Sequence, residues 1–214
     1  MKKSVSVFLT IVLVFSLLLP SISQAATPSS FPDVSSFKDE IEFLTDEGII
    51  FGYSDGTFRP NAPIKRAQAV VMLMRHLKPE LDSVPNPNFS DIKPGDFGYK
   101  EVAQAVEMGI INGKVNNRFD PNGNLTRAEM AIILVRAYEM SGIYPKGFSD
   151  VSTSSVAYWY ISALAANNIT IGYPDGTFKP SLTINRGQFS AFMARILEPS
   201  FQPSNMEVAD TYLE

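Results

Sequence analysis

The chain has 214 residues, of which 45% are hydrophobic and 19% charged, and its formal net charge at pH 7 is −4. This composition is typical of a folded protein with a buried core. The negative charge argues against nucleic-acid binding, which needs a broad basic surface. The absence of cysteine excludes disulfide bonds and a lipid-modified cysteine.

The first 25 residues have the features of a secretory signal peptide. A short basic start at 1–3 precedes a nearly unbroken apolar run at 6–20, and small residues lead up to Ala25. We expect cleavage after Ala25, the alternative being an uncleaved anchor. No later apolar run is long enough to span a bilayer, so no membrane contact is expected after cleavage.

The rest of the chain repeats with a period near 60 residues. Arg66 and Arg127 are 61 positions apart, and Arg127 and Arg186 are 59 apart. The predicted organisation is a signal peptide at 1–25, units at 31–77, 89–140 and 148–198, linkers at 78–88 and 141–147, and a tail at 199–214. Because one unit cannot bury its apolar faces alone, the three units should pack on one another.

Each unit begins with Phe-x-Asp followed by a predicted helix. The aspartates Asp33, Asp91 and Asp150 are expected to accept backbone N–H bonds in a turn or a helix cap. Apolar residues spaced three to four apart predict first helices at about 37–47, 99–108 and 158–167. The left-handed conformation is accessible to glycine and asparagine, so these helices should end at Gly48, Gly109 and Asn168.

A short turn segment follows each first helix. Residues 52–58 read Gly-Tyr-Ser-Asp-Gly-Thr-Phe, and 172–178 nearly repeat them, which predicts a small β-hairpin. Unit two has Asn116-Asn117 at this point, and asparagine also tolerates positive φ. The preceding glycines satisfy the turn geometry or let a sugar approach the backbone: Gly52, Gly113 and Gly172.

The second predicted helix of each unit starts at the repeated arginine. Thr126 and Glu129 fit a capping box, Asn185 and Gln188 fit a weaker version, and Lys65 cannot cap. The helical spacing places these residues inward: Val70, Leu73, Met74, Leu77, Ala131, Leu134, Val135, Tyr138, Ser190, Met193, Ala194 and Leu197.

The arginine stands at the partly positive end of its helix, which is mildly unfavourable without a negative group nearby. One explanation is an anionic ligand, since helix N–H groups and a guanidinium together suit a carboxylate. The other is an ion pair with an acidic residue of a neighbouring unit, such as one of the Phe-x-Asp aspartates. A second arginine, nine residues later, lies at the favourable helix end and needs no function: Arg75, Arg136 and Arg195.

The signal peptide, the three units, the Gly-Tyr-x-Asp-Gly-Thr-Phe turn and the Thr126-Arg127-Ala128-Glu129 stretch together resemble the S-layer homology domain family. The resemblance implies a mainly α fold, in which three helix–hairpin–helix repeats pack as a pseudo-threefold spindle around a central helix bundle with grooves between units. It implies non-covalent attachment to secondary cell-wall polysaccharide, often pyruvylated, at the bacterial surface. The chain departs from the family at Gly187 and in the aromatic near the first helix: unit two has Phe97, but Phe37 of unit one stands one place later and Trp159 of unit three stands three places later.

The ligand-binding candidates follow from the arginine stretch and the turn. They are Arg66, Arg127, Arg186, Lys65, Gln68, Glu129, Gln188, Gly52, Gly113, Gly172, Tyr53, Tyr173 and Trp159. The aromatic members either stack on sugar or pack between units. Unit two, with Thr126, Arg127 and Glu129 intact, is expected to be the main groove component, and unit one the most diverged.

The sequence gives little support for catalysis, metal binding or a cofactor. His76 is the sole histidine, and the loop starting at Asp120 has Ala131 where a calcium loop needs glutamate. We therefore expect a non-enzymatic, secreted anchor for a pyruvylated polysaccharide. The alternative is a surface-layer component that self-associates, or an adaptor that binds surface-layer proteins.

Overall fold

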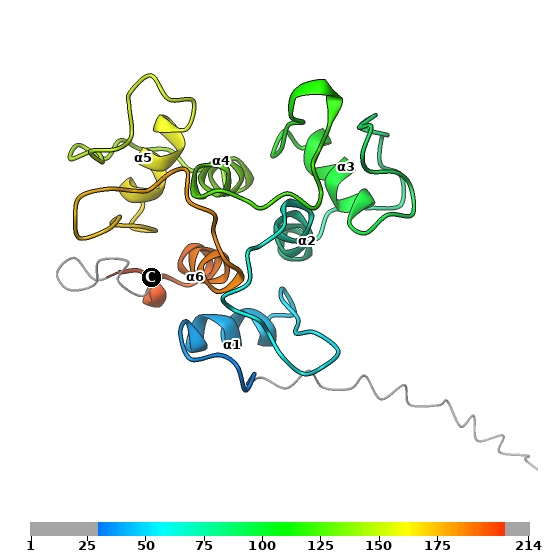
Figure 1. Cartoon of the computed structure of the whole chain (residues 1–214), viewed down its shortest axis with the longest axis horizontal. Coiled ribbons are helices and arrows are strands. Elements are labelled where there is room, and N and C mark those ends of the chain that lie inside the picture. The colour runs from blue at the N-terminus through cyan, green and yellow to red at the C-terminus, as the bar shows by residue number, and fades with distance from the viewer. Residues whose placement is uncertain (1–29, 204–214) are drawn as a thin grey trace, which may run out of the picture.

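The computed structural model describes residues 30–203, so the predicted signal peptide and positions 204–214 of the predicted tail lie outside the described residues. The described part is mainly α-helical, which confirms the predicted class (Figure 1). Its helices are α1 (Lys38–Asp46), α2 (Arg66–Leu77), α3 (Tyr99–Glu107), α4 (Arg127–Ala137), α5 (Tyr158–Ala166) and α6 (Arg186–Leu197), with 3-10 turns η1 (Val115–Asn117) and η2 (Pro199–Phe201). None of the helices within 30–203 is both long and apolar enough to cross a membrane.

The predicted first helices correspond to α1, α3 and α5, and their stop signals are confirmed. Gly48, Gly109 and Asn168 have φ of 69°, 70° and 58°, the left-handed conformation that ends a helix. The bond from Ile49 N to Leu44 O (2.9 Å) closes the end of α1. The local sequence therefore fixes the length of these helices.

The second helices α2, α4 and α6 begin at Arg66, Arg127 and Arg186, as predicted. Their predicted inward positions are buried, apart from the half-buried Leu77, Tyr138 and Leu197 at the C-terminal ends. Helix α6 is the most enclosed of the three, because every residue from Arg186 to Arg195 is buried.

The predicted β-hairpin is wrong: residues 30–203 contain isolated β-bridges but no strand. The tight turn itself is present, with Tyr53 N bonded to Thr57 O (2.7 Å) and Tyr173 N to Thr177 O (2.8 Å). The segment after the turn does not continue as a strand, because its backbone N–H groups donate to the side chain of an aspartate. The carboxylate of Asp33 accepts from Phe58 N (2.9 Å) and from the next backbone N–H.

The other two aspartates do the same, which confirms their predicted role as acceptors of backbone N–H bonds. Asp91 accepts from Phe119 N (2.7 Å), and Asp150 accepts from Phe178 N (2.8 Å). Each bond spans 25 to 29 residues, so the aspartate ties the start of a unit to the end of its turn. This link is tertiary rather than the local cap that the sequence suggested.

The middle glycines make room for the phenylalanine that heads each unit. A methyl group on Gly113 would overlap the Phe89 ring, and a methyl group on Gly52 would overlap Phe31. Gly172 meets the corresponding phenylalanine of unit three and also has φ of 75°. These glycines therefore serve the packing of the fold, which favours the structural alternative.

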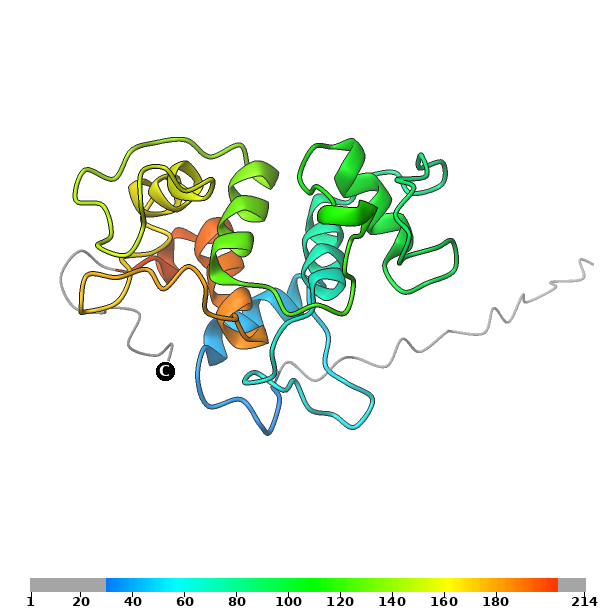
Figure 2. The same ribbon diagram turned by 45° about the horizontal axis from the view of Figure 1, so that its top comes forward.

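The units are joined in a closed ring. Helix α3 packs on α2, α5 on α4, and α1 on α6, so each first helix lies against the second helix of the preceding unit (Figure 1). Three backbone bonds close the ring: Ile64 N to Ile184 O (3.1 Å), Ile184 N to Leu125 O (2.9 Å) and Leu125 N to Ile64 O (3.0 Å). In Figure 2 the long connecting loops lie outside the helices α2, α4 and α6.

Candidate functional site

The repeated arginines reach from one unit into the next. Arg66 Nε donates to Phe119 O (3.0 Å), Arg127 Nε to Phe178 O (2.8 Å), and Arg186 Nε to Phe58 O (3.0 Å). All three arginines are buried, with 5%, 1% and 6% exposure. Each guanidinium also lies over the ring of the phenylalanine whose carbonyl it binds, at 4.5 to 5.1 Å. Carbonyl oxygens and aromatic faces thus supply the negative partners that the helix start lacks.

The first N–H groups of these helices are used by the fold. Arg66 N donates to Gly123 O (3.0 Å) and Ala67 N to Pro121 O (3.1 Å), both in the next unit, and α4 and α6 repeat the pattern. The third N–H is capped in α4, where Thr126 Oγ1 accepts from Glu129 N (3.2 Å). The expectation that helix N–H groups hold a ligand carboxylate is therefore wrong for these positions.

The capping predictions are confirmed. Glu129 Oε2 accepts from Thr126 N (3.0 Å), which completes the box, and Asn185 and Gln188 form its amide version at 2.8 and 3.1 Å. Lys65 has no acceptor, and here only Gln68 Oε1 reaches back to Lys65 N (3.1 Å). The ammonium group of Lys65 instead donates to Asn124 Oδ1 (2.7 Å).

The predicted ion pair with an acidic residue of a neighbouring unit exists for Arg66, although the acid is not one of the aspartates given as examples. Arg66 Nη1 lies 3.2 Å from Glu129 Oε1 in unit two. Asp91, the partner expected from the sequence, is held by backbone N–H groups of its own unit and by Arg118 Nε (3.2 Å). The Asp91 carboxylate is thus already bonded within its own unit, and the capping residue Glu129 is the ion-pair partner of Arg66 instead.

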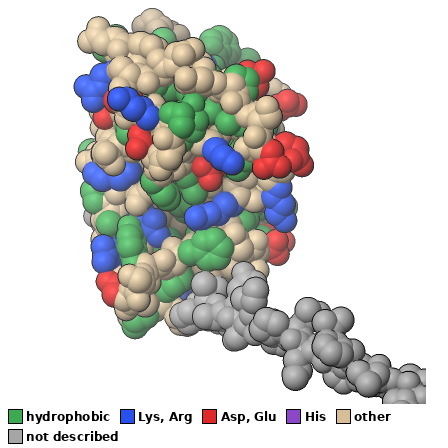
Figure 3. Space-filling view, turned by 90° about the vertical axis from the view of Figure 1, so that its right-hand side faces the viewer, with side chains coloured by type: hydrophobic (Ala, Val, Ile, Leu, Met, Phe, Trp, Pro, Cys, Tyr) green, Lys and Arg blue, Asp and Glu red, His purple; other side chains and the backbone are tan. Residues whose placement is uncertain are grey.

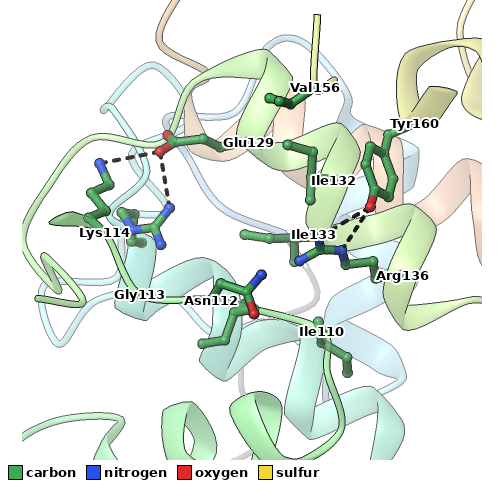
Figure 4. Close-up of a pocket in the computed structure, with 12 residues that line it drawn as sticks. Ile110, Asn112, Gly113, Lys114, Glu129, Ile132, Ile133, Arg136, Val156 and Tyr160 are labelled. Carbon is green, nitrogen blue, oxygen red and sulfur yellow. Dashed lines mark hydrogen bonds and ion pairs between the residues drawn. The ribbon is translucent and has the colours of Figure 1, made fainter. Parts of the chain in front are cut away.

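A hollow of about 290 Å³ lies where these residues meet, and we call it the Arg66 groove. Figure 4 shows that Lys114 points to Glu129 and that Arg136 points to the Tyr160 hydroxyl. Arg66 pairs with the same glutamate. Its walls are the segment 110–114, one face of α4 and the start of α5. The full lining is Arg66, Ile110, Ile111, Asn112, Gly113, Lys114, Glu129, Ile132, Ile133, Arg136, Val156 and Tyr160.

The charges of the Arg66 groove compensate one another. Lys114 Nζ lies 3.2 Å from Glu129 Oε1, the same oxygen that Arg66 contacts. Burial raises the pKa of Glu129, but the Thr126 N–H bond and the two cations outweigh it, so the pKa is lowered. Burial lowers the pKa of Arg66, and Glu129 opposes that shift. Glu129 is therefore a carboxylate at neutral pH, held between two cations.

A second hollow, of about 210 Å³, occupies the equivalent place one unit earlier, and we call it the Arg186 groove. Arg186 Nη2 donates to Phe51 O (3.3 Å), and the Arg75 guanidinium lies 4.7 Å from the Phe51 ring. Burial lowers the pKa of Arg186 most, and the neighbouring cations Arg59 and Arg75 act in the same direction. The lining is Phe51, Gly52, Tyr53, Gln68, Val71, Met72, Arg75, Phe97 and Arg186.

At the third equivalent place, which we call the Arg127 region, the corresponding side chains are buried. Phe192 is fully buried there, with the guanidinium groups of Arg127 and Arg195 at 5.5 and 5.7 Å from its ring. Tyr173 and Gln188, which correspond to Tyr53 and Gln68, are each only 6% exposed. A phenylalanine thus stands where the other units have Met72 and Ile133.

The predicted ligand-binding residues of unit two therefore lie in different places. Glu129 lines the Arg66 groove, whereas Arg127 lies in the Arg127 region with 1% exposure. The two residues lie in different places because the arginine reaches the next unit and the glutamate pairs with Arg66 of the previous one. Trp159 lies in neither groove: it is 61% exposed beside Ile143 in a separate hollow of about 380 Å³.

The sequence analysis missed three charged groove residues, which are Arg75, Arg136 and Lys114. Arg75 and Arg136 stand nine residues after the first arginines, and their position in the last helical turn was explained by the helix dipole alone. The constant nine-residue spacing, two and a half helical turns, was the available signal. Lys114 carried no repeat signal, because the other units have tyrosine at that position. Among residues 30–203 no cluster of histidine, aspartate or glutamate is arranged to hold a metal ion.

Comparison with known proteins gives the family. The sequence profile of the S-layer homology domain matches residues 30–70, 88–131 and 147–190. The chain belongs to the S-layer homology domain family. Its three repeats are S-layer homology repeats, and the family places it among secreted bacterial proteins of the cell surface, where such domains anchor proteins to the wall.

The similarity to individual relatives covers most of this chain but a small part of theirs. The Surface-layer 125 kDa protein of Lysinibacillus sphaericus is 34% identical over 197 residues, 88% of this chain and 16% of that protein. An endoglucanase of Bacillus sp. (strain KSM-635) is 33% identical over 92% of this chain and 22% of the enzyme. An S-layer protein of Bacillus thuringiensis subsp. finitimus is 29% identical over 80% of this chain and 22% of its own length. The chain thus spans less than a quarter of each of these relatives.

Proposed function

We propose that the chain attaches to the cell wall by binding a carboxylated, pyruvylated polysaccharide in its inter-unit grooves. The observation that carries the proposal is the presence of two hollows that each hold two arginines from different units, Arg66 with Arg136 and Arg186 with Arg75. A pyruvate ketal places a carboxylate on a sugar ring, and a guanidinium suits a carboxylate in charge and shape. The spindle implied by the family resemblance would display both hollows on its circumference, which agrees with the ring of unit contacts.

The surface around the grooves supports an anionic and partly apolar ligand. On the side where α3 lies, basic and apolar side chains interleave, and several acidic ones gather along one edge (Figure 3). Phe51 and Phe97 remain 40% and 63% exposed at the Arg186 groove. Aromatic faces beside guanidinium groups are suited to a charged sugar.

We propose binding without catalysis. The similarity to the endoglucanase is confined to 22% of that enzyme, and the same part is shared with S-layer proteins. Wall binding therefore accounts for what these relatives have in common with this chain. Release of reducing sugar from purified wall by the chain would contradict this proposal.

Sedimentation with purified wall sacculi tests the function. Arg75 and Arg136 are half-buried and end their helices, so the double variant Arg75→Gln/Arg136→Gln should fold and yet sediment less than wild type. Lys146→Gln, which removes one positive charge at an exposed site outside both grooves, is the control for each single substitution and should sediment like wild type.

Chemical removal of pyruvate from the wall distinguishes the alternative. Wild type should lose most of its binding to depyruvylated sacculi. Binding that survives this treatment and the double substitution would instead favour self-association or an adaptor that binds surface-layer proteins. The exposed Trp159 and Ile143 would then be the first side chains to replace.

A further inference from the structure

We infer that the Arg186 groove is the primary carboxylate site of this chain, and that Gln68 determines this preference. The inference rests on the proposed function, because it concerns which groove takes the carboxylate of the polysaccharide. The two grooves are built alike from the same repeat positions. They differ in charge at two equivalent positions: the Arg66 groove has Glu129 and Lys114, where the Arg186 groove has the neutral Gln68 and Tyr53.

In the Arg66 groove the place of a ligand carboxylate is already taken. Glu129 Oε1 lies 3.2 Å from both Arg66 Nη1 and Lys114 Nζ, and the side chain is 26% exposed (Figure 4). An incoming carboxylate must share these cations with Glu129 or displace it. Sharing brings two like charges together in a partly buried site, and displacement leaves Glu129 without partners; both oppose binding.

In the Arg186 groove no such internal carboxylate is present. Gln68 keeps the structural bond of the capping box, since its Oε1 accepts from Lys65 N (3.1 Å), and its Nε2 lies 3.4 Å from Tyr53 Oη. Within residues 30–203, no carboxylate lies at ion-pair distance from Arg186 or Arg75. Glu101 acts on Arg75 from farther away. An external carboxylate would therefore meet no internal carboxylate that competes for the half-buried Arg75 and the 6% exposed Arg186.

The exposed phenylalanines also favour the Arg186 groove as the primary carboxylate site. Phe51 and Phe97, 40% and 63% exposed, line the Arg186 groove, and the positions equivalent to them in the Arg66 groove are Asn112 and Val156. A pyranose ring presents an apolar C–H face, for which an exposed phenylalanine is a better partner than asparagine or valine. Of the two grooves, only the Arg186 groove therefore combines a carboxylate site with a stacking surface.

Two near-isosteric substitutions test the inference. Gln68→Glu places a carboxylate in the Arg186 groove and retains the bond to Lys65 N, as Glu129 retains its equivalent bond. Glu129→Gln removes the carboxylate from the Arg66 groove. Asn86→Asp is the control: it adds the same charge at an exposed linker position and keeps the bond that Asn86 Oδ1 accepts from the backbone N–H two residues on.

The probe is a methyl hexoside that carries a 4,6-linked pyruvate ketal, titrated calorimetrically into the full chain. Gln68→Glu should raise the dissociation constant by about tenfold or more, since a like charge then faces the ligand carboxylate in a partly buried site. Asn86→Asp should leave the dissociation constant unchanged. Glu129→Gln should leave it unchanged or lower it.

The outcomes separate the two proposals. Equal dissociation constants for wild type and Gln68→Glu, or a loss of affinity in Glu129→Gln, would overturn the choice of groove and leave the proposed function standing. Failure of wild type to bind both the pyruvylated hexoside and the sacculi would overturn both. Thermal unfolding of each variant, expected near that of wild type, identifies any loss caused by misfolding.

Discussion

The contact between Gly113 and Phe89 allows a sharp test of whether the repeated glycines serve the fold or the ligand. A methyl group on Gly113 would overlap the Phe89 ring and lie 3.2 Å from Arg118 O. The ring has little room to retreat, because it stacks on the fully buried Phe119 at 5.8 Å. The φ of Gly113 lies outside the left-handed region, so backbone strain does not confuse the comparison.

The expected magnitude follows from two opposing effects. Overpacking a well-filled site costs about 1–3 kcal/mol, while replacing glycine with alanine at an ordinary φ stabilises by about 0.4–1 kcal/mol through the unfolded chain. We therefore expect Gly113→Ala to lower the free energy of unfolding by about 1–2 kcal/mol. Urea denaturation followed by circular dichroism measures the change.

A double-mutant cycle with Phe89→Ala identifies the cause. Removing the ring makes space for the methyl group, so the double variant should be more stable than the sum of the single effects by about 1 kcal/mol. Additivity within about 0.5 kcal/mol would refute the steric reasoning. An alanine variant of undiminished stability that no longer sediments with wall sacculi would show instead that a sugar approaches this backbone.

Three further predictions concern the caps, the turn and the pH dependence. Thr126→Ala should lower the free energy of unfolding by about 1 kcal/mol, because α4 loses the side-chain cap of its first turn. Urea denaturation measures this change, and a loss below about 0.3 kcal/mol would contradict the role of Thr126 as a cap. Asp91→Ala should cost about 2–3 kcal/mol, since it leaves two backbone N–H groups of unit two without their acceptor, and a thermal melt unchanged from wild type would rule this out. The pKa of Glu129 is lower folded than unfolded, so its contribution is present above the unfolded pKa and is lost as pH falls through the folded one. Urea titrations at a series of pH values from neutral to acid should show a smaller loss of stability in Glu129→Gln than in wild type, and parallel curves would count against this.

The sequence predicts the local part of this fold well. Helix starts at Arg66, Arg127 and Arg186, the stops at Gly48 and Gly109, and the cap at Thr126 all depend on residues within a few positions. Each is decided by backbone hydrogen bonds of one helix end, which nearby side chains supply or withhold. The turn is also local, and only its continuation as a hairpin is wrong.

The site is less predictable because its contacts join distant parts of the chain. Arg186 Nε and Phe58 O are 128 residues apart, and nothing near Arg186 indicates which unit its side chain will meet. For the same reason the sequence does not show that Arg127 and Glu129, only two positions apart, contact different units. Repeat order alone leaves open whether a side chain points to the next unit or the previous one, and the packing of α1 on α6 decides it.

The pairing of α1 with α6 also sets the number of repeats. In an open solenoid each added repeat lengthens the array and only the ends need capping. Here the bonds among Ile64, Leu125 and Ile184 form a triangle in which every member gives one bond and receives one. Without the third repeat, one N–H and one C=O of this triangle would lack a partner, and α1 would lose its contact with α6. A fourth repeat would find no unpaired N–H or C=O in the triangle. Three repeats therefore close the ring of backbone bonds.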